Sequence, residues 1–164
     1  MTSQTLVLQW KPEYELGDPL IDAQHKRIFT MANTALGCTA SADIVAAIME
    51  LYKYTRMHFD AEEGLMAARG YDAIACAAHA DMHNKITAKL VRFSSAIWGS
   101  PLEEVSTGLH ALITDWVLNH ILTEDMNLPR LAQAHAGSYS EAPLDWEALQ
   151  DNLQREAENG RTTR

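Results

Sequence analysis

The stretch HFDAEEGLM, residues 58–66, decides how this 164-residue chain folds. His58 and Glu62 are four residues apart, and on an α-helix this spacing puts both side chains on one face, one turn apart. Leu65 and Met66 continue the helical pattern on its apolar side. A histidine and a glutamate directed together toward an apolar interior are costly to bury unless something satisfies them. The stretch therefore predicts a helix that presents metal ligands to a protein core.

The other candidate ligands lie on both sides of this stretch. His79 and His83 repeat the four-residue spacing, which is the arrangement that chelates one ion from a single helix. His25 precedes the stretch, and His120 and Asp125 follow it. Each residue alone is most simply a surface or hydrogen-bonded side chain. Together they place at least one ligand on every predicted helix, and helix bundles build two-metal sites in their cores in this way.

Helix start and stop signals divide the chain into four long helices. Asp18 can cap the first helix, with Pro19 at the first helical position, where its missing N–H costs nothing. Ser100, Pro101 and Glu103 read as the cap, first residue and capping box of the fourth. The helices are expected at about 18–37, 41–70 (capped by Ser41), 72–99 and 100–129. Short connections between them predict an all-α, up-down-up-down four-helix bundle.

Segments at both ends are expected to lie outside this bundle. Residues 1–17 lack helical periodicity and read as an ordered N-terminal arm. We expect residues 1–131 to form the bundle domain and residues 132–164 a linker with a C-terminal helical extension. A helix over about 143–158 would carry an apolar stripe of Trp146, Leu149 and Leu153. The stripe indicates docking on the bundle surface, self-association or binding of a protein partner, and the sequence leaves these alternatives open.

Composition excludes several classes of partner. Hydrophobic residues make up 47% of the chain and the formal net charge is −9, which argues against a nucleic-acid partner, because phosphate binding needs clustered Lys and Arg. No apolar run approaches the roughly 20 residues that span a bilayer. Cys38 and Cys76 are far apart and are expected to be reduced thiols. No secretory signal is recognised, so the expected location is cytoplasmic.

The candidate ligands also restrict the metal. Imidazoles with carboxylates and no thiolate suit iron, manganese, zinc or copper better than an iron–sulfur cluster. Five imidazoles and two carboxylates are too many ligands for one ion. Two ions sharing bridging carboxylates fit better, and a three-to-two division of the imidazoles leaves one ion with an open position where a small ligand can enter.

Four segments, in order, resemble the signature of the bacterial members of the hemerythrin family. They are Trp10-x3-Tyr14-x2-Gly17-x3-Ile21-Asp22-x-Gln24-His25-Lys26, His58-Phe59-x2-Glu62-Glu63-x2-Met66, His79-x3-His83 and Trp116-x3-His120-Ile121-x3-Asp125. The resemblance covers about residues 8–130. It implies two iron ions, diferrous or diferric, with an oxo or hydroxo bridge. His110 and His135 match no part of this signature and are expected to be surface or supporting residues.

The resemblance also assigns roles to residues. It implies that His79, His83 and His120 bind one iron, that His25 and His58 bind the other, and that Glu62 and Asp125 bridge them. Side chains that match the wall of the O2 pocket in the family are Phe59, Trp116, Val117 and Ile121. An apolar wall of this kind both packs the bundle and excludes water.

These implications make reversible O2 binding the leading hypothesis, for storage, delivery or sensing, and not an enzymatic activity. One alternative is a sensor that signals the state of the iron through the C-terminal extension. Another is a di-iron enzyme that reduces peroxide or nitric oxide. The enzyme hypothesis is disfavoured because carboxylate-rich sites with Glu-x-x-His pairs are typical of ferritin-like di-iron proteins.

Overall fold

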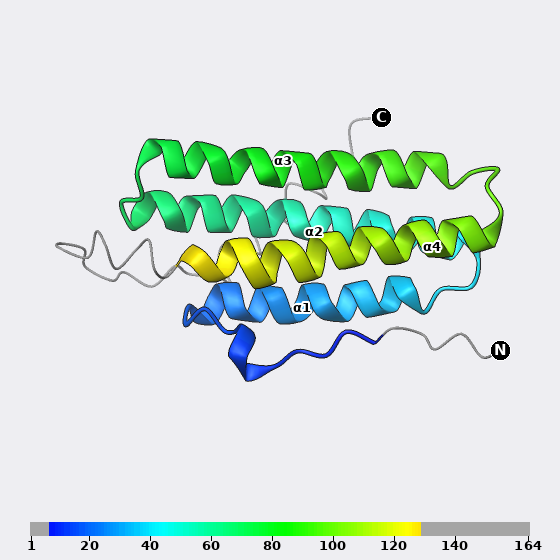
Figure 1. Cartoon of the computed structure of the whole chain (residues 1–164), viewed down its shortest axis with the longest axis horizontal. Coiled ribbons are helices and arrows are strands. Elements are labelled where there is room, and N and C mark those ends of the chain that lie inside the picture. The colour runs from blue at the N-terminus through cyan, green and yellow to red at the C-terminus, as the bar shows by residue number, and fades with distance from the viewer. Residues whose placement is uncertain (1–6, 129–164) are drawn as a thin grey trace, which may run out of the picture.

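The long helices α1 to α4 lie side by side in the computed structural model (Figure 1). The structure describes residues 7–128, with the exception of the side chains of residues 117 and 118. The helices are η1 (Pro12–Tyr14), α1 (Pro19–Leu36), α2 (Ser41–Ala68), α3 (Ala73–Ala96), α4 (Leu102–Ile113), η2 (Thr114–Glu124) and η3 (Asp125–Asn127). α1 packs on α2, α2 on α3, and α4 on both α1 and α3, so the bundle closes. The predicted all-α, up-down-up-down four-helix bundle is confirmed.

Local start and stop signals act at three of the four long helices. Asp18 accepts hydrogen bonds from the backbone N–H groups of the first turn of α1, and Asp72 does the same for α3. Gly70 and Gly99 follow α2 and α3 with positive φ angles of 73° and 89°, which glycine adopts without steric cost. Gly37, after α1, ends its helix in a right-handed conformation instead.

Two predicted caps are wrong. Ser41 is the first residue of α2, and Ala40 occupies the cap position without a side-chain hydrogen bond. At the fourth helix, Pro101 has an extended backbone (ψ 141°) and is itself the cap residue, so the helix begins at Leu102. The Ser100 hydroxyl donates to the carbonyl of Ala96 at the end of α3 and closes the preceding helix.

The fourth rod differs from the single α-helix that the sequence predicts. It is α-helical only to Ile113, continues as the π-helix η2, and ends in the short 3-10 helix η3. π-Helices are rare and are often associated with functional sites. In this chain, η2 carries Trp116 and His120, and Asp125 follows it directly.

The interior has an apolar end and a polar end. The apolar end lies toward the α1–α2 and α3–α4 connections, where Ile44, Ile48, Ile97 and Leu109 are at most 2% exposed. The candidate ligands occupy the other end, where α2 passes into α3. The N-terminal arm closes the side of α1, because the Asn33 side chain exchanges two hydrogen bonds with the backbone of Leu8. The extension predicted for residues 132–164, including the 143–158 helix, lies outside the described residues.

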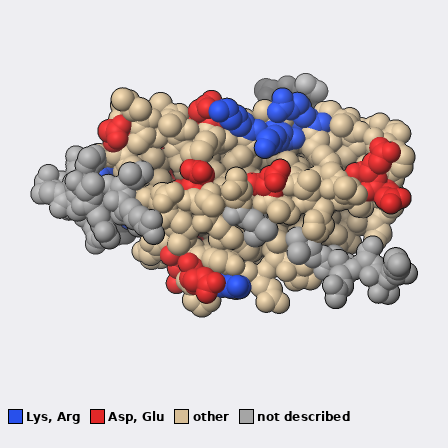
Figure 2. All heavy atoms as spheres, in the orientation of Figure 1, with Lys and Arg blue, Asp and Glu red and all other residues tan. Residues whose placement is uncertain are grey.

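Charged side chains lie mostly on the outer surface. Figure 2 shows Lys and Arg side chains gathered toward the edge of the molecule that α3 forms in this view. The exposed residues of α3 include Lys85, Lys89 and Arg92 at helical spacing. No helix within residues 7–128 combines the length and apolar character needed to span a membrane. Apart from Asp22, the charged side chains buried within the described part all belong to the candidate ligand set.

Two helical glycines give a matched test of the packing. A Cβ added at Gly64, on the exposed side of α2, meets no atom within 4 Å, whereas at Gly108 it would lie 2.9 Å from the Phe93 ring. We expect Gly64→Ala to raise the free energy of unfolding by about 0.5–1 kcal/mol, because alanine loses less backbone entropy on folding. Gly108→Ala should gain less or lose stability. Urea unfolding of both variants checks this, and an equal gain would contradict the close α3–α4 approach.

Candidate metal centre

All seven predicted ligands come together in the polar half of the bundle. They are buried, with exposed fractions between 0% and 4%. α1 supplies one, α2 and α3 supply two each, and η2 and η3 supply one each: His25, His58, Glu62, His79, His83, His120 and Asp125. Their candidate ligand atoms form two groups, and within each group these atoms lie within 4.8 Å of one another.

The first group has three imidazoles. The Nε2 atoms of His83 and His120 are 3.1 Å apart, and the Nε2 atoms of His79 and His83 each lie 3.2 Å from Oε2 of Glu62. Asp125 Oδ1 is 3.1 Å from Nε2 of His120. Two ligands bound at right angles about 2.1 Å from one ion would be about 3.0 Å apart. These atoms therefore have the spacing that a single metal ion requires.

The second group has two imidazoles and the same two carboxylates. His25 Nε2 lies 3.2 Å from Oδ2 of Asp125, and His58 Nε2 lies 3.9 Å from Oε2 of Glu62. Asp125 thus directs one oxygen toward each group of imidazoles. Carboxylates shared between two groups of imidazoles are what a two-ion site needs.

The π-helix accounts for the position of Asp125. In an α-helix, residues five apart are about 140° apart around the axis. The i→i+5 hydrogen bonds of a π-helix bring such residues nearly into line. The backbone N–H of Asp125 donates to the carbonyl of His120, and this is an i→i+5 hydrogen bond of the π-helical type. The wider helix therefore lets His120 and Asp125 face the same cluster.

Two further side chains orient the imidazoles. His58 Nδ1 donates to Oε1 of Gln24 at 2.8 Å, and His83 Nδ1 donates to Oε1 of Glu63 at 2.8 Å. Both bonds place the proton on Nδ1 and leave the Nε2 lone pair directed into the cluster, as metal-bound histidines require. The sequence interpretation did not assign these roles. A polar Gln24 within the buried stripe of α1 was the available signal for one of them.

Burial and neighbouring charges set the protonation of the metal-free cluster. Burial lowers the pKa of His58 to about 3, so its imidazole is neutral. Burial and the Asp125 charge raise the pKa of Glu62, but the imidazoles of His79 and His83, whose Nε2 atoms lie 3.2 Å from its Oε2, outweigh them and hold the pKa of Glu62 at about 2. Burial likewise opposes ionisation of Asp125, yet the imidazoles of His120 and His25 beside its two oxygens lower its pKa below the usual range. The neutral His58 imidazole and the ionised carboxylates are in the forms that bind metals. At His79, burial lowers the pKa, but the hydrogen bond to Glu62 and the Glu62 charge outweigh it and raise the pKa.

These shifts predict acid lability of the metal-free protein. The unfolded state takes up a proton at His58 below about pH 6.5, whereas the folded state does so only near 3, so stability falls as the pH falls between these values. Because the pKa of Glu62 is lowered from 4.5 to about 2, the loss of stability continues as the pH falls through this range. Thermal unfolding between pH 7.5 and 4 measures this slope. His58→Leu should reduce it, whereas replacement of the exposed His110 should not.

An apolar wall lies against one side of the cluster. Phe59, Trp116 and Ile121 are at most 3% exposed. The Phe59 ring stacks on the His83 imidazole at a centroid distance of 3.8 Å and meets Trp116 edge-on at 6.4 Å. The side chain of Val117 and the whole of His135 lie outside the described residues. The wall shields the imidazoles of the first group from water.

The buried polar atoms fit a metal centre. Within the described part of the chain, His25 Nε2, His58 Nε2, Glu62 Oε1 and both carboxylate oxygens of Asp125 are buried without a hydrogen-bond partner. Each such atom costs about 1–3 kcal/mol. Metal ions would satisfy all of them at once, and a donor set of imidazoles and carboxylates suits iron.

Comparison with known proteins agrees with this geometry. The family described as Hemerythrin HHE cation binding domain matches residues 16–132. The chain is similar to the bacteriohemerythrin of Stenotrophomonas maltophilia, with 29% identity over 82% of this chain and 87% of that protein. It is 34% identical to the bacteriohemerythrin of Pseudomonas aeruginosa, over 72% and 76% of the two chains. It is 27% identical to that of Clostridium acetobutylicum, over 71% and 94%. The chain therefore belongs to the hemerythrin family, whose members bind non-haem iron.

Proposed function

We propose that this protein binds O2 reversibly at a centre of two iron ions. His79, His83 and His120 hold one ion, His25 and His58 hold the other, and the carboxylates of Glu62 and Asp125 bridge them. The observation that carries the proposal is the sharing of these two carboxylates between a three-imidazole and a two-imidazole group. The three-to-two division leaves one ion with fewer protein ligands and room for a small molecule.

The protein's own side chains hold the ligands in place and keep water away. When bound, the iron pair supplies the electrons that O2 takes up and gives back. Gln24 and Glu63 keep the imidazoles of His58 and His83 turned toward the ions. Phe59, Trp116 and Ile121 form the apolar side on which O2 is held. Exclusion of water there slows loss of the bound ligand and irreversible oxidation.

We propose a carrier in preference to an enzyme because of the ligand balance. Five neutral imidazoles surround two carboxylates, and the helical pairs are His-x3-Glu and His-x3-His. Ferritin-like di-iron sites instead combine several glutamates with Glu-x-x-His pairs. Fewer anionic ligands stabilise high-valent iron less well and favour stopping at reversible binding. Whether the bound O2 serves storage, delivery or sensing depends on partners of the protein.

The test is a metal count with visible spectra of the purified full chain. About two irons per chain are expected. Absorption bands of the ferric protein should bleach with dithionite, and a new band should appear when oxygen is admitted to the reduced protein and disappear under vacuum. One metal per chain, or zinc in place of iron, would contradict the two-iron centre. Irreversible oxidation without an oxygen-dependent band would contradict reversible binding, and fast turnover of peroxide or nitric oxide would favour an enzyme.

A further inference from the structure

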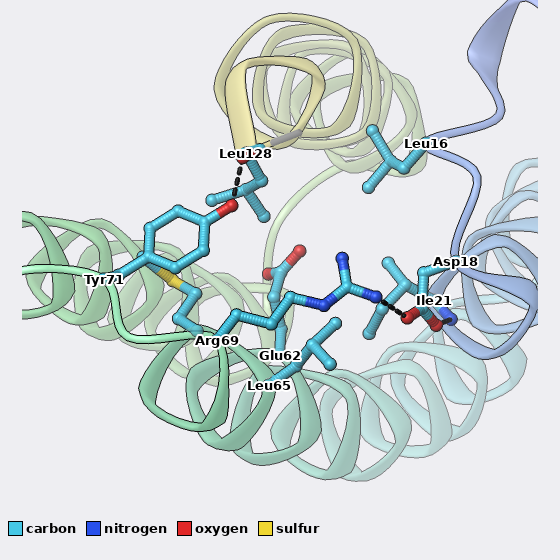
Figure 3. Close-up of a pocket in the computed structure, with 9 residues that line it drawn as sticks. Leu16, Asp18, Ile21, Glu62, Leu65, Arg69, Tyr71 and Leu128 are labelled. Carbon is cyan, nitrogen blue, oxygen red and sulfur yellow. Dashed lines mark hydrogen bonds and ion pairs between the residues drawn. The ribbon is translucent and has the colours of Figure 1, made fainter. Parts of the chain in front are cut away.

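A pocket at the end of the bundle borders the candidate metal centre at Glu62 and includes none of the side chains of the apolar wall. Its volume is about 330 Å³, including space open to solvent. It lies where α1 begins, α2 ends and η3 ends, and Figure 3 shows the Glu62 carboxylate pointing into it. Glu62 is fully buried, and its Oε1 has no hydrogen-bond partner among the described residues. The pocket thus leads from the surface toward a carboxylate of the cluster that is itself closed off from solvent.

An ion pair lies at the outer part of this pocket. Arg69, which directly follows α2, places Nη2 2.7 Å from Oδ2 of Asp18. The side chain of Arg69 is 44% exposed and that of Asp18 is 14% exposed. In Figure 3 the guanidinium extends past Glu62 to reach Asp18. A partly exposed ion pair of this kind is worth only about 0–1 kcal/mol, so it opens readily.

The two sides of the cluster differ in the kind of molecule they suit. A hydrated Fe²⁺ ion loses solvation on entering an apolar environment, so the wall of Phe59, Trp116 and Ile121 opposes it. The pocket is also lined mainly by apolar side chains, but unlike the wall it carries the carboxylates of Asp18 and Glu62, and such oxygen ligands can replace water as the ion moves inward. The positive charge of Arg69 repels a cation and occupies Asp18 while the ion pair is closed.

We propose that metal ions enter and leave the centre through this pocket, and that the Asp18–Arg69 ion pair restrains their passage. The inference rests on the proposed metal centre and adds a route to it. Arg69→Gln removes the repelling charge and frees one oxygen of Asp18, while the other oxygen still caps α1. Leu16→Trp acts in the opposite direction, because Leu16 lines the pocket from the N-terminal arm and a larger side chain there narrows it.

The experiment follows loading of the metal-free full chain with Co²⁺, by its visible absorption, and with Fe²⁺ under anaerobic conditions. Release to a chelator is measured in the same samples. We expect Arg69→Gln to load and release both metals several-fold faster and Leu16→Trp to do so several-fold more slowly, with the same final number of ions. The control is Lys53→Gln, which removes an exposed cation paired with Glu50 on α2, away from the pocket.

The outcomes separate the route from the centre. If the unaltered chain does not take up about two ions, the proposed centre fails. If it does, but Arg69→Gln and Leu16→Trp leave the rates unchanged, the centre stands and the route is wrong. A rate increase shared by Lys53→Gln would mean that net charge, and not the ion pair at the pocket, controls loading, which also overturns the proposal.

Discussion

Glu62→Gln is expected to abolish binding of the second iron, whereas Glu63→Gln should retain two irons. The two glutamates are neighbours in sequence, and both substitutions remove one charge without changing side-chain size. Glu62 is fully buried and close to imidazoles of both groups, so its carboxylate is positioned to bridge. An amide is neutral and a much weaker bridging ligand. The metal count should fall from about two to one or fewer, and the oxygen-dependent absorption band should disappear.

Glu63→Gln tests a different property of the same cluster. Glu63 is 39% exposed and accepts a hydrogen bond from Nδ1 of His83. A carboxylate in this position makes the imidazole a stronger donor to the metal, and loss of such a partner typically lowers metal affinity about 10–100-fold. We therefore expect two irons at saturating metal, weaker retention against a chelator, and a higher reduction potential. Loss of the second iron in Glu63→Gln but not in Glu62→Gln would reverse the assignment of the bridge.

The sequence predicted the elements that depend on local spacing. The four-residue separations of His58 from Glu62 and of His79 from His83 predict pairs on one helix face, and the structure places each pair on one side of the cluster. Asp18 and Asp72 mark helix starts correctly because an aspartate cap bonds only to the next two or three residues. Local chemistry determines these features, so a single sequence is enough to predict them.

Features that depend on tertiary packing were not predicted. An α-helical pattern places His120 and Asp125 on different faces, and nothing in the local sequence indicates the change to i→i+5 bonding that brings them together. The Asp18–Arg69 ion pair joins residues 51 apart in sequence, and the His58–Gln24 bond joins residues 34 apart. Such contacts follow from how the helices pack, which periodicity does not specify.

Removal of both metal ions is expected to lower the midpoint of thermal unfolding by roughly 15–30 °C. Each ion, at a free concentration about 1,000 times its dissociation constant, stabilises the folded state by about 4 kcal/mol. In a domain of this size, 1 kcal/mol shifts the midpoint by about 2–4 °C. Without metal, the cluster also retains buried atoms that lack hydrogen-bond partners. Calorimetry of the iron-loaded and chelator-treated chain measures the difference.

The local loss of order that accompanies metal removal should be greatest at one end of the bundle. The apolar end, with Ile44, Ile48, Ile97 and Leu109, needs no metal to stay packed, so the metal-free protein should remain helical there. At the other end, η2 and η3 contribute His120 and Asp125 to the cluster. These polar side chains do not pack in the apolar core, so this end depends on the metal for its stability. Hydrogen exchange of the metal-free chain should therefore rise most in residues 114–127 and least around residues 44–51. A uniform rise would mean that the metal supports the whole fold. An unchanged midpoint would mean that these buried ligands are already satisfied without it.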